Sequence, residues 1–525
     1  MKMRESALQK ALFKQMRTPE FYPHPAHTVT VCETHISMVF LAGDVVYKIK
    51  KSVGLGFLDF TTLENRRHFC AREVALNRRL TNNVYLDVTE ITRKGDLFYL
   101  GGDGTVVEYA VRMRKLSETH SMKQLLRSGK IGNKDIDRLA MELSEFYGSD
   151  TSHRQPNMEA AFETIRQNCD ENFKQAQSLL GSMFDGDCFQ SVWSRTDAFL
   201  NRHPPLFFRR MENERFRDCH GDLRTGHIYF TDTGIQIIDC IEFNDRFRYQ
   251  DVGADLAFLV MDMELLGFPA LAEKFLSAYA GYSHDPEVYV LMNFYKCYRA
   301  MVRFKVNCIR LQEHDVCEQE RNKLLKKTKK YLALSDRYAD RFSRPMIWVI
   351  CGMPASGKST LAQALCLALN IRSINSDVVR KKIFSAPPTD PENMPFEKGM
   401  YSETATGRTY DALVSLAEKE IKKGNSVVID ATFSRETYRK QVVSMAEQSG
   451  AGIVFTECTV PDPVLQERLI MRKGRDTISD ARISHFQSFK TRFEPIRKTE
   501  TNHYIKVDTE ASMDASLSKI LPRII

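Results

Sequence analysis

The segment that begins at Met346, MIWVICGMPASGKSTLAQAL, constrains the fold of this chain more than any other part of the sequence. It places Gly352, Gly357, Lys358 and Ser359 in the pattern GxxxxGK[ST], which is typical of a loop that holds nucleotide phosphates. An apolar run enters the loop and a helical pattern leaves it, so the motif has the strand, loop and helix context that it requires. The sequence therefore predicts a nucleotide site here, with an ordinary glycine turn as the alternative.

The chemistry of nucleotide phosphates assigns roles within this loop. Backbone N–H groups around Ala355 to Gly357 are expected to converge on the β-phosphate, at the N-terminus of a helix whose dipole favours anions. Lys358 would bridge the β- and γ-phosphates of ATP, and the Ser359 hydroxyl would ligate Mg²⁺. The predicted nucleotide-binding residues of the loop are Gly352, Ala355, Ser356, Gly357, Lys358, Ser359 and Thr360.

The length and composition are those of an ordinary multidomain protein. At 525 residues the chain exceeds the size at which single hydrophobic cores stop growing, so two or three domains are expected. Its 43% hydrophobic and 27% charged residues are typical of a soluble protein, and no segment approaches the length of a membrane span. The N-terminal sequence MKMRESALQKALFK has charges every few residues, which predicts a helix instead of a signal peptide, and therefore a cytoplasmic protein.

The cysteines and the net charge narrow the choice of function only slightly. Twelve cysteines occur without a CxxC pair, which indicates reduced thiols and argues against structural zinc. The formal charge of +8 is compatible with a polyanionic partner, although nucleotide phosphates alone would explain a basic excess. Neither membrane association nor an obligate protein partner is indicated.

Short strands joined by tight turns are expected in the N-terminal third. The residue pattern predicts strands over 27–32, 37–42 and 45–50, a helix over 65–80, and strands over 86–92 and 97–100. Lys48 lies on the third strand and Glu73 on the helix, as in the ion pair that orients nucleotide phosphates in protein-kinase-like folds. By itself this pair is a weak signal, because many strands contain Lys and most helices contain Glu.

The segment CHGDLRTGHIYF strengthens the assignment of Lys48 and Glu73. It holds Asp222 just before a polar turn and an apolar strand, and Asp239 ends a second apolar strand, IQIID. This part of the chain, from about residue 25 to about residue 340, resembles the aminoglycoside phosphotransferase family, a branch of the protein-kinase fold. The resemblance implies that Asp222 is the catalytic base and that Asp239 holds Mg²⁺, while Lys48 and Glu73 orient the nucleotide.

His227 departs from the pattern of that family, in which a metal-binding Asn lies five residues after the catalytic Asp. Mg²⁺ prefers oxygen ligands, whereas neutral imidazole suits softer transition metals. Asp239 and His227 would be the metal ligands of this domain. Three alternatives follow: the domain holds one metal ion where the family holds two, it uses Mn²⁺, or it binds a nucleotide but transfers little phosphate. No glycine-rich motif covers the first turn, so the segment 33–37 would have to serve as the phosphate lid. His220 is expected to pack and hydrogen-bond beneath the catalytic loop.

A basic segment and a proline mark the end of this part of the chain. Residues 323–330 would contact a polyanion or, as is more common, form the solvated face of a helix. Pro345 marks the predicted boundary between a kinase-like domain over 1–343 and a second domain over 344–525. Within the first domain, the lobes are expected over about 1–112 and 113–343.

Strands and helices alternate regularly after Pro345. The pattern predicts strands over 346–350, 372–375, 426–430, 452–460 and 503–507 in a parallel sheet covered by helices. The predicted fold class is therefore an α+β protein-kinase-like domain followed by an α/β P-loop domain with a parallel sheet.

Three further groups follow strands of this sheet, at the edge where ligands of parallel sheets bind. Asp377 and Arg380 lie one helical turn apart, so that Asp377 would accept the proton of an attacking hydroxyl while Arg380 holds the acceptor. Asp430 ends an apolar strand and resembles a Walker B carboxylate, which would help to hold Mg²⁺. The arginines that would form a lid over the transferring phosphoryl group are Arg468, Arg472 and Arg475.

This constellation resembles the P-loop kinases that include polynucleotide 5′-hydroxyl kinases, zeta toxins and gluconate-kinase-like enzymes. The segments GMYSETATGRTY and VVIDATFSRETYRK also resemble a predicted-kinase branch that is often fused behind an aminoglycoside-phosphotransferase-like domain. The resemblance implies that Asp377 is the general base and Arg472 the lid arginine, and we assign Arg475 to the acceptor together with Arg380. Asp377 would also suit a helix N-cap, and the arginines would also suit salt bridges on an exposed helix.

Together these residues predict an ATP-dependent phosphotransferase that moves the γ-phosphate to a hydroxyl group, with the P-loop domain as its main catalytic unit. The acceptor stays open between a nucleic-acid 5′-hydroxyl and a small sugar or other metabolite. The alternative is a nucleotide-responsive switch, in which one domain binds ATP and gates a partner or the other domain. His227 favours this alternative for the first domain.

Overall fold

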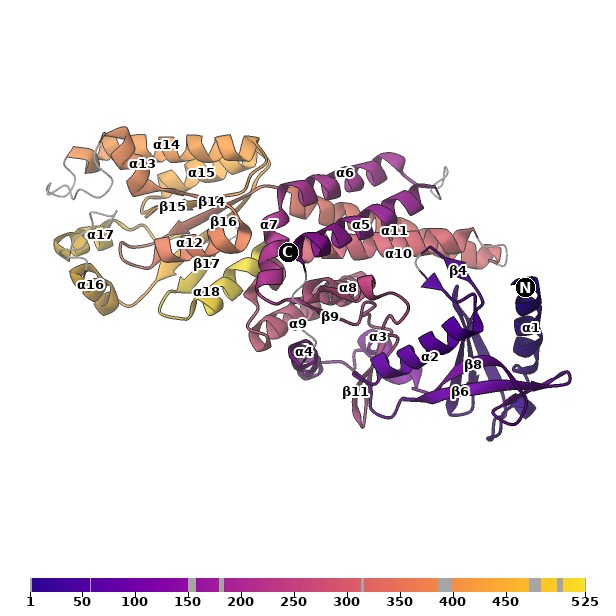
Figure 1. Cartoon of the computed structure of the whole chain (residues 1–525). Coiled ribbons are helices and arrows are strands. Elements are labelled where there is room, and N and C mark those ends of the chain that lie inside the picture. Colours follow the sequence, from indigo (N-terminus) through magenta and orange to yellow (C-terminus); the bar gives the residue numbers. More distant parts are fainter. Residues whose placement is uncertain are drawn as a thin grey trace. The chain divides into compact units, whose positions relative to one another are not determined.

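The computed structural model describes residues 2–56, 58–149, 157–178, 184–312, 316–385, 399–471, 483–497 and 504–524. Backbone contacts divide the chain into two compact units (Figure 1). Unit 1 comprises Met1–Gly181, Arg210–Ser283 and Tyr298–Tyr331, and unit 2 comprises Ser182–Arg209, His284–Cys297 and Leu332–Ile525. Among the described residues, no helix combines the length and the apolar character that crossing a membrane requires.

Unit 1 begins with a six-stranded antiparallel sheet. In spatial order its strands are β1 (Val29–Glu33), β2 (Ser37–Ala42), β3 (Val45–Lys50), β8 (Thr105–Arg114), β6 (Tyr85–Lys94) and β7 (Leu97–Leu100). The turn between β2 and β3 requires glycine, because Gly43 has a φ of +61° and a Cβ there would lie 2.7 Å from the Pro25 carbonyl oxygen. The predicted strands occur here with ends displaced by a few residues.

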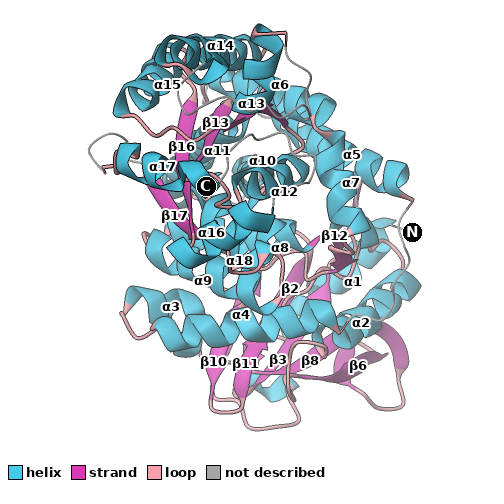
Figure 2. Ribbon diagram, turned by 90° about the vertical axis from the view of Figure 1, so that its left-hand side faces the viewer, coloured by secondary structure: helices cyan, strands magenta, loops and turns pink. Residues whose placement is uncertain are grey.

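A helix that follows β3 in the chain packs on one face of this sheet. Helix α2 (Leu63–Asn77) begins after Thr62, whose side chain accepts a hydrogen bond from the Asn65 backbone N–H, and it lies on β8 and β6 (Figure 2). Its buried residues recur at helical spacing: Arg66, Cys70, Glu73, Val74 and Asn77. This buried face therefore contains charged groups, and it carries Glu73 under the sheet.

The rest of unit 1 is mainly helical. Its helices are α1 (Lys2–Gln15), α3 (Met122–Arg127), α4 (Asn133–Gly148), α5 (Met158–Gln177), α8 (Val252–Leu265) and α9 (Pro269–Tyr282), with single turns η1 (Pro19–Phe21), η2 (Glu118–His120) and η4 (Asp245–Phe247). Three short antiparallel pairs complete it: β4 (Gly54–Leu55) with β5 (Leu58–Asp59), β9 (Phe216–Asp218) with β12 (Tyr249–Asp251), and β10 (Ile228–Thr231) with β11 (Gly234–Ile237). Helices α7 (Pro204–Glu212), α10 (Met292–Leu311) and α11 (Glu318–Ser343) contain residues of both units.

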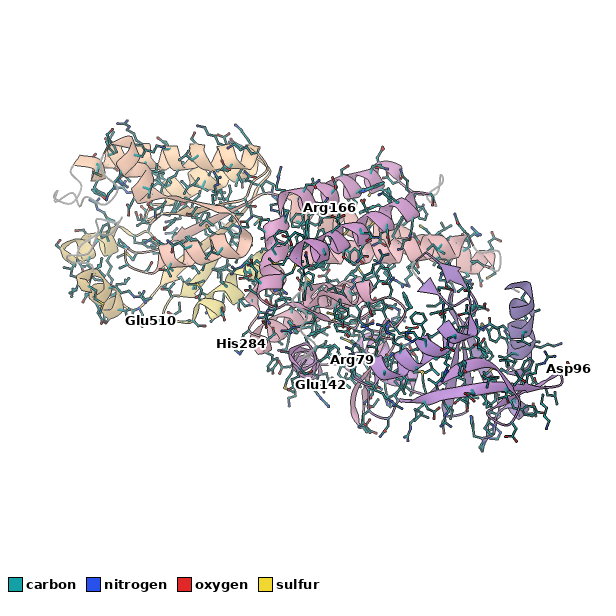
Figure 3. The ribbon with its side chains drawn as sticks, in the orientation of Figure 1. Arg79, Asp96, Glu142, Arg166, His284 and Glu510 are labelled. Carbon is teal, nitrogen blue, oxygen red and sulfur yellow. The ribbon has the colours of Figure 1, made fainter. Side chains whose placement is uncertain are left out.

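An arginine just after α2 ties the sheet lobe of unit 1 to its helical lobe. Figure 3 labels this residue, Arg79. Its guanidinium lies 3.1 Å from a carboxylate oxygen of Asp218 and 5.2 Å from the centre of the Phe146 ring. These contacts come from β9 and α4, so one side chain holds the end of α2 against both elements.

Unit 2 contains a five-stranded parallel sheet. In spatial order its strands are β14 (Arg372–Asn375), β15 (Val427–Asp430), β13 (Met346–Cys351), β16 (Gly452–Thr459) and β17 (Tyr504–Asp508). Helices α14 (Glu403–Lys422) and α15 (Glu436–Gln448) cover one face, and α12 (Lys358–Leu369) and α18 (Met513–Ile520) cover the other (Figure 1). The remaining helices are α6 (Gly186–Arg202), α13 (Ser376–Ile383), α16 (Asp462–Met471) and α17 (Phe486–Arg492), with η5 (Pro286–Tyr289), η6 (Gly399–Tyr401), η7 (Ile483–His485) and η8 (Leu521–Ile524). The predicted fold class, a kinase-like α+β part followed by a parallel-sheet α/β part, is confirmed.

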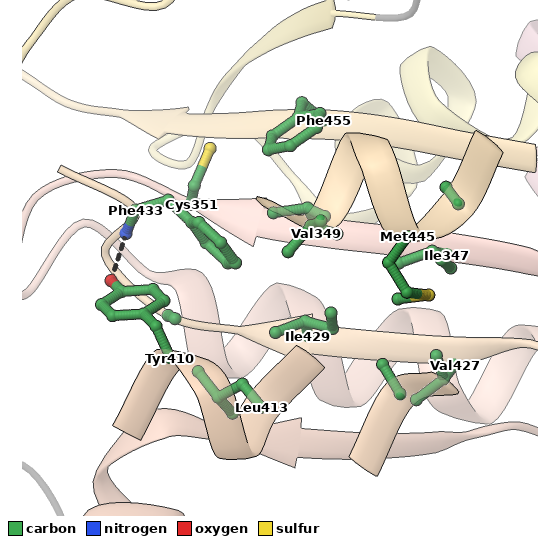
Figure 4. Packing of buried hydrophobic residues seen from close by; sticks show 14 of the residues in the cluster. Ile347, Val349, Cys351, Tyr410, Leu413, Val427, Ile429, Phe433, Met445 and Phe455 are labelled. Atoms are coloured by element: carbon green, nitrogen blue, oxygen red, sulfur yellow. Dashed lines mark hydrogen bonds between the residues drawn. The ribbon is translucent and has the colours of Figure 1, made fainter. Parts of the chain in front are cut away.

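A cluster of buried apolar side chains packs around the central strands of this sheet. Val349 on β13 and Ile429 on β15 are fully buried, and Leu413 of α14 and Phe455 of β16 belong to the same cluster (Figure 4). The Tyr410 hydroxyl in this cluster accepts a hydrogen bond of 2.9 Å from the backbone N–H of Phe433, which follows β15. Strands buried on both faces read as continuous apolar runs, which is why the sequence revealed them.

The boundary after residue 343 remains a prediction. The fragment 344–525 contains all five strands of the parallel sheet, so we expect it to fold by itself and to bind ATP. Circular dichroism during thermal unfolding and an ATP titration of the fragments 1–343 and 344–525 test this expectation. If neither fragment unfolds cooperatively and neither binds ATP, the boundary is misplaced.

Candidate functional site

The phosphate loop of unit 2 connects β13 to α12 through a backbone that requires glycine at two positions. Gly352 has a φ of +128°, and a Cβ there would lie 2.5 Å from the Cys458 carbonyl oxygen. Gly357 has a φ of +86° and caps α12, so the helix starts at Lys358 with its N–H groups directed into the loop. The Lys358 Nζ donates a 2.9 Å hydrogen bond to the Met353 carbonyl oxygen, which folds the side chain over the loop.

A pocket of about 160 Å³ lies in front of this loop. Its wall combines residues that the sequence places far apart. They are Pro354, Ala355, Gly357, Lys358, Ser359, Thr360, Asn375, Ser376, Asp377, Arg380, Tyr401, Tyr410, Asp430, Thr432 and Phe489. Most of the predicted nucleotide, acceptor and catalytic residues of unit 2 therefore face one space, whereas Gly352 and Ser356 support the loop from outside it.

Asp430 joins two elements at the floor of the pocket. One of its carboxylate oxygens accepts hydrogen bonds of 2.7 Å from both the Ser359 hydroxyl and the Asn375 side-chain amide. The carboxylate is only 4% exposed, so this pairing satisfies a buried charge. Sequence reasoning missed Asn375, although its place at the end of a strand beside the other strand-end residues could have indicated it.

Asn375 also fixes the helix that carries Asp377. Its side-chain oxygen accepts hydrogen bonds from the backbone N–H groups of Asp377 (3.0 Å) and Val378 (3.1 Å), which makes Asn375 the N-cap of α13. Asp377 is therefore not the cap residue that the sequence also allowed. One amide links the Asp430 carboxylate to the first turn of α13.

Arg380 is buried on the next turn of α13, not exposed on a helix surface. Its guanidinium donates a 2.7 Å hydrogen bond to the Met400 carbonyl oxygen and lies 4.8 Å from the centre of the Tyr401 ring. Among the described residues, its Nε has no hydrogen-bond partner. The role of Arg380 toward an acceptor remains a prediction.

The predicted lid residues Arg472 and Arg475 lie outside the described residues. Arg468, which is described, reaches the carbonyl oxygens of Ala355 (3.4 Å) and Thr509 (3.5 Å) from α16. It therefore lies beside the phosphate loop.

Unit 1 brings together the two residues that the kinase-like pattern singled out. The Lys48 Nζ lies 2.8 Å from a carboxylate oxygen of Glu73 and 2.5 Å from one of Asp239. Burial opposes the charge of Lys48, but Asp239 and Glu73 outweigh it and raise the pKa of the lysine above its ordinary value. Lys48 also holds the pKa of Asp239 well below its usual range.

A second lysine lies on the same face of β3 because side chains alternate along a strand. The Lys50 Nζ lies 2.8 Å from the other carboxylate oxygen of Glu73 and also pairs with Glu242. Lys50 is 1% exposed, and Glu73 is fully buried between the two lysines. The sequence analysis missed Lys50 and Glu242, since only the fold brings Glu242 to this strand.

Asp222 is clamped by an arginine two residues later. The Arg224 guanidinium donates two hydrogen bonds of 2.8 Å to the two carboxylate oxygens of Asp222. Burial alone would raise the pKa of Asp222, but Arg224 and His227 outweigh it and hold the pKa well below its ordinary value. As arranged here, the carboxylate is a weak base.

His227 lies between the carboxylates of Asp222 and Asp239. Its Nδ1 is 3.0 Å from the Asp222 carbonyl oxygen, and Arg224 donates to its Nε2 at 2.8 Å. Burial, and then Arg224, lower the pKa of His227 to about 4, so the ring is neutral near pH 7. The Nε2 lone pair is therefore taken by Arg224. Within the described ranges, no group of three or more His, Cys, Asp or Glu side chains is arranged to hold a metal ion.

His220 lies beneath this loop, as the sequence analysis expected. It is fully buried, its Nε2 is 2.9 Å from the Ile238 carbonyl oxygen, and its backbone N–H donates a 2.7 Å hydrogen bond to Asp255. Gly221 donates to the other carboxylate oxygen of Asp255 at 2.8 Å. One buried carboxylate thus fixes the backbone that presents Asp222.

Two family models match separate parts of the chain. Residues 148–289 match the phosphotransferase enzyme family, and residues 347–496 match an AAA domain. The chain contains a phosphotransferase-family domain followed by an AAA P-loop domain. The kinase-like and P-loop resemblances predicted from the sequence are confirmed. These domains support a phosphotransferase activity and nucleotide binding.

Known proteins resemble most of the chain or one part of it. The uncharacterized protein Rv2004c of Mycobacterium tuberculosis is 28% identical over 465 residues, which cover 87% of this chain and 90% of the mycobacterial one. Choline kinase from Cryptosporidium parvum is 12% identical and covers 63% of this chain and 96% of its own, with a TM-score of 0.38. A gluconokinase from Sinorhizobium meliloti is 18% identical and covers 34% of this chain and 91% of its own, with a TM-score of 0.26.

Replacement of Asn375 by alanine in the AAA domain is expected to slow phosphoryl transfer by about 10- to 100-fold, the usual cost of losing a residue that orients the ligands of a site. The change removes the amide that links Asp430 to α13. Asn375→Asp keeps the cap but turns the donor to Asp430 into a second carboxylate 2.7 Å away, so it should lower both the rate and the melting temperature. Asn425→Ala, near the opposite ends of the strands, is the matched control. Rates of transfer equal to the parent rate in Asn375→Ala would contradict this role.

Proposed function

We propose that the AAA P-loop domain of unit 2 transfers the γ-phosphate of ATP to a hydroxyl group of an acceptor. The observation that carries this proposal is the single pocket lined by Lys358, the Ser359–Asp430 pair and Asp377. A phosphate-binding loop alone would indicate nucleotide binding. A carboxylate from another helix, facing the same space, is the additional group that a hydroxyl acceptor needs.

In this mechanism the acceptor oxygen attacks the γ-phosphorus, and the bond from that phosphorus to the bridging oxygen of ADP breaks. Asp377 takes the proton of the acceptor hydroxyl. Lys358 neutralises charge on the β- and γ-phosphates, and the loop N–H groups hold the β-phosphate at the start of α12. ADP is the leaving group.

The donor set at Asp430 suits Mg²⁺. The Ser359 hydroxyl and the Asp430 carboxylate present oxygen atoms 2.7 Å apart, and hard cations prefer oxygen ligands. Bound Mg²⁺ would supply charge screening for the phosphates there. Asn375 would keep the Asp430 carboxylate oriented toward Ser359.

The acceptor that we infer is a nucleic-acid 5′-hydroxyl or a small sugar or other metabolite. The buried guanidinium of Arg380 beside the Tyr401 ring supports an acceptor with an anionic or planar group next to its hydroxyl. Arg472 and Arg475 are proposed to close over the acceptor and the transferring phosphoryl group.

Unit 1 supports a second function, that of a nucleotide-responsive module. Lys48 and Glu73 are paired, as a nucleotide site requires, but Asp239 is bound by Lys48 and Asp222 by Arg224. Both carboxylates are thus neutralised by cations of the chain itself. This arrangement favours nucleotide binding with slow transfer over an efficient second kinase site.

Acceptor screening with γ-labelled ATP tests both proposals on the full chain. The panel contains 5′-hydroxyl oligonucleotides, sugars, sugar acids and nucleotide sugars, and each is offered to the parent, Lys358→Ala and Asp222→Asn. We expect the label to reach one acceptor class with the parent and Asp222→Asn, but not with Lys358→Ala. Transfer that survives Lys358→Ala and is lost in Asp222→Asn would assign the chemistry to unit 1 instead.

Replacement of His227 by asparagine is expected to strengthen Mg²⁺-dependent nucleotide binding or transfer in unit 1. An amide oxygen then replaces an imidazole nitrogen that accepts from Arg224, and Mg²⁺ prefers oxygen. Titrations of Mg²⁺ and Mn²⁺ with the fragment 1–343 measure the effect, with the exposed His120→Asn as control. If the metal dependence of the two variants and the parent is the same, His227 has no part in a metal site.

A further inference from the structure

The loop of unit 1 that carries Asp222, the predicted catalytic base, has several cationic side chains around it. Apart from the Arg224 that clamps Asp222, cations from three other elements lie close enough to Arg224 to interact as one group: Lys123 of α3, Arg303 of α10 and Lys327 of α11. These elements are far apart in the sequence and meet only in the fold. The grouping is therefore a product of the tertiary structure.

Short contacts fix the position of this cluster beside Asp222. The Lys123 backbone N–H donates a 3.1 Å hydrogen bond to the Thr225 carbonyl oxygen, which holds the start of α3 on the catalytic loop. The Thr225 N–H donates to the Asp262 carboxylate at 3.1 Å. The Lys327 Nζ lies 6.0 Å from the centre of the Tyr331 ring.

Among the described residues, the nearby carboxylates are too few to balance these cations. Arg224, Lys123, Arg303 and Lys327 lie near Asp222 and Asp262, and a third carboxylate that Arg224 affects, Asp239, is already paired with Lys48. Loss of solvent around Lys327, and then repulsion from Arg303, Lys123 and Arg224, lower the pKa of Lys327. A bound anion would relieve this repulsion.

Arg303 adds an unpaired hydrogen-bond donor to this cluster. Its Nε is buried and has no hydrogen-bond partner among the described residues. The positive charge of Arg303 works to lower the pKa of both Asp222 and Tyr331. Its guanidinium therefore lies between the loop that carries Asp222 and helix α11. A buried donor without a partner costs free energy unless a ligand completes it.

We propose that Lys123, Arg303 and Lys327 form an anion-binding site beside Asp222, which takes the phosphate or carboxylate group of a small hydroxyl-bearing molecule. The three cations gather at one place beside Arg224, which fits a single anionic group better than an extended polyanion. An anion bound there also competes with Asp222 for Arg224. The ligand would thereby weaken the clamp that makes Asp222 a poor base.

Calorimetric titration of the full chain with glycerol 3-phosphate, and with glycerol as the neutral counterpart, tests this site. The titration uses the Lys358→Ala variant, which prevents phosphate binding by the loop of unit 2. A nonhydrolysable ATP analogue is added in excess, so that it fills the proposed nucleotide site of unit 1. The test therefore measures binding in unit 1, and its failure leaves the transfer proposed for unit 2 untouched. Glycerol 3-phosphate is expected to bind and glycerol is not.

Two variants in that background locate the anion. Lys327→Gln and Arg303→Gln should each weaken glycerol 3-phosphate binding by about tenfold, because each removes one charge-assisted contact. Lys329→Gln is the matched control, since Lys329 is exposed and two residues along the helix places it on the opposite side. Lys327 is exposed, so Lys327→Gln is expected to fold. It therefore keeps the test valid if Arg303→Gln does not fold.

Three results would overturn the proposal. The first is the absence of glycerol 3-phosphate binding, and the second is binding that Lys327→Gln leaves unchanged. The third concerns a single-stranded oligonucleotide. If it binds more tightly than glycerol 3-phosphate and Lys329→Gln weakens it as much as Lys327→Gln, the basic residues form an extended polyanion surface instead.

Discussion

Replacing Lys358 by alanine is expected to reduce nucleotide binding and phosphoryl transfer by unit 2 together, each by about 100- to 1,000-fold. In the proposed reaction the Lys358 ammonium would contact phosphates in both the ground state and the transition state, so its loss should affect both. In the structure the side chain folds back onto the Met353 carbonyl oxygen and lines the pocket, in position to move onto a phosphate.

Nucleotide titration by calorimetry and single-turnover transfer rates measure the two effects of Lys358→Ala separately. Lys422→Ala is the matched control, because Lys422 lies on α14 with its side chain 69% exposed. The expectation fails if Lys358→Ala binds ATP as the parent does. The phosphate loop would then be a glycine turn with another role.

Asp377→Asn is expected to bind ATP almost normally and to lose about 100- to 10,000-fold in transfer rate, or roughly 3 to 5 kcal/mol of barrier. The side chain lines the pocket, where we propose that the acceptor binds, and it is not needed as the cap of α13, since Asn375 caps that helix. The melting temperature should therefore change little, while the reaction loses its proton acceptor.

Transfer rates of Asp377→Asn at saturating ATP, together with its ATP dissociation constant, decide this point. Asp411→Asn, on the exposed side of α14, controls for loss of a negative charge elsewhere in unit 2. If Asp377→Asn transfers phosphate to a verified acceptor at the parent rate, Asp377 is not the base. Asp430 would then be the next carboxylate to replace.

These two variants separate binding from chemistry only because the fold puts both groups in one pocket. Lys358 reaches it from α12, which follows β13, and Asp377 from α13, which follows β14. Both strands end at the same edge of the sheet, with only β15 between them. Unit 1 uses a comparable design with a different result, since Arg224 and Lys48 already occupy its two carboxylates.

The sequence by itself determined the features that depend on neighbours along the chain. The phosphate loop, the alternation of strands and helices after Pro345, and the positions of Lys48 and Glu73 follow from spacing, periodicity and apolar runs. These patterns reflect local geometry, because a strand repeats every two residues and a helix every 3.6. The same patterns carried the likeness to two kinase families, and the family models bear it out.

Only the tertiary structure decided which distant side chains meet. Asn375 is bonded to Asp430, Lys50 is paired with Glu242, and Lys327 lies near Arg224, although no pattern of spacing relates the members of these pairs. Their meeting depends on sheet order and helix packing, which bring residues far apart in the chain within a few ångströms. A buried charge must then be paired or hydrogen-bonded, so the fold, not the local sequence, selects the partners.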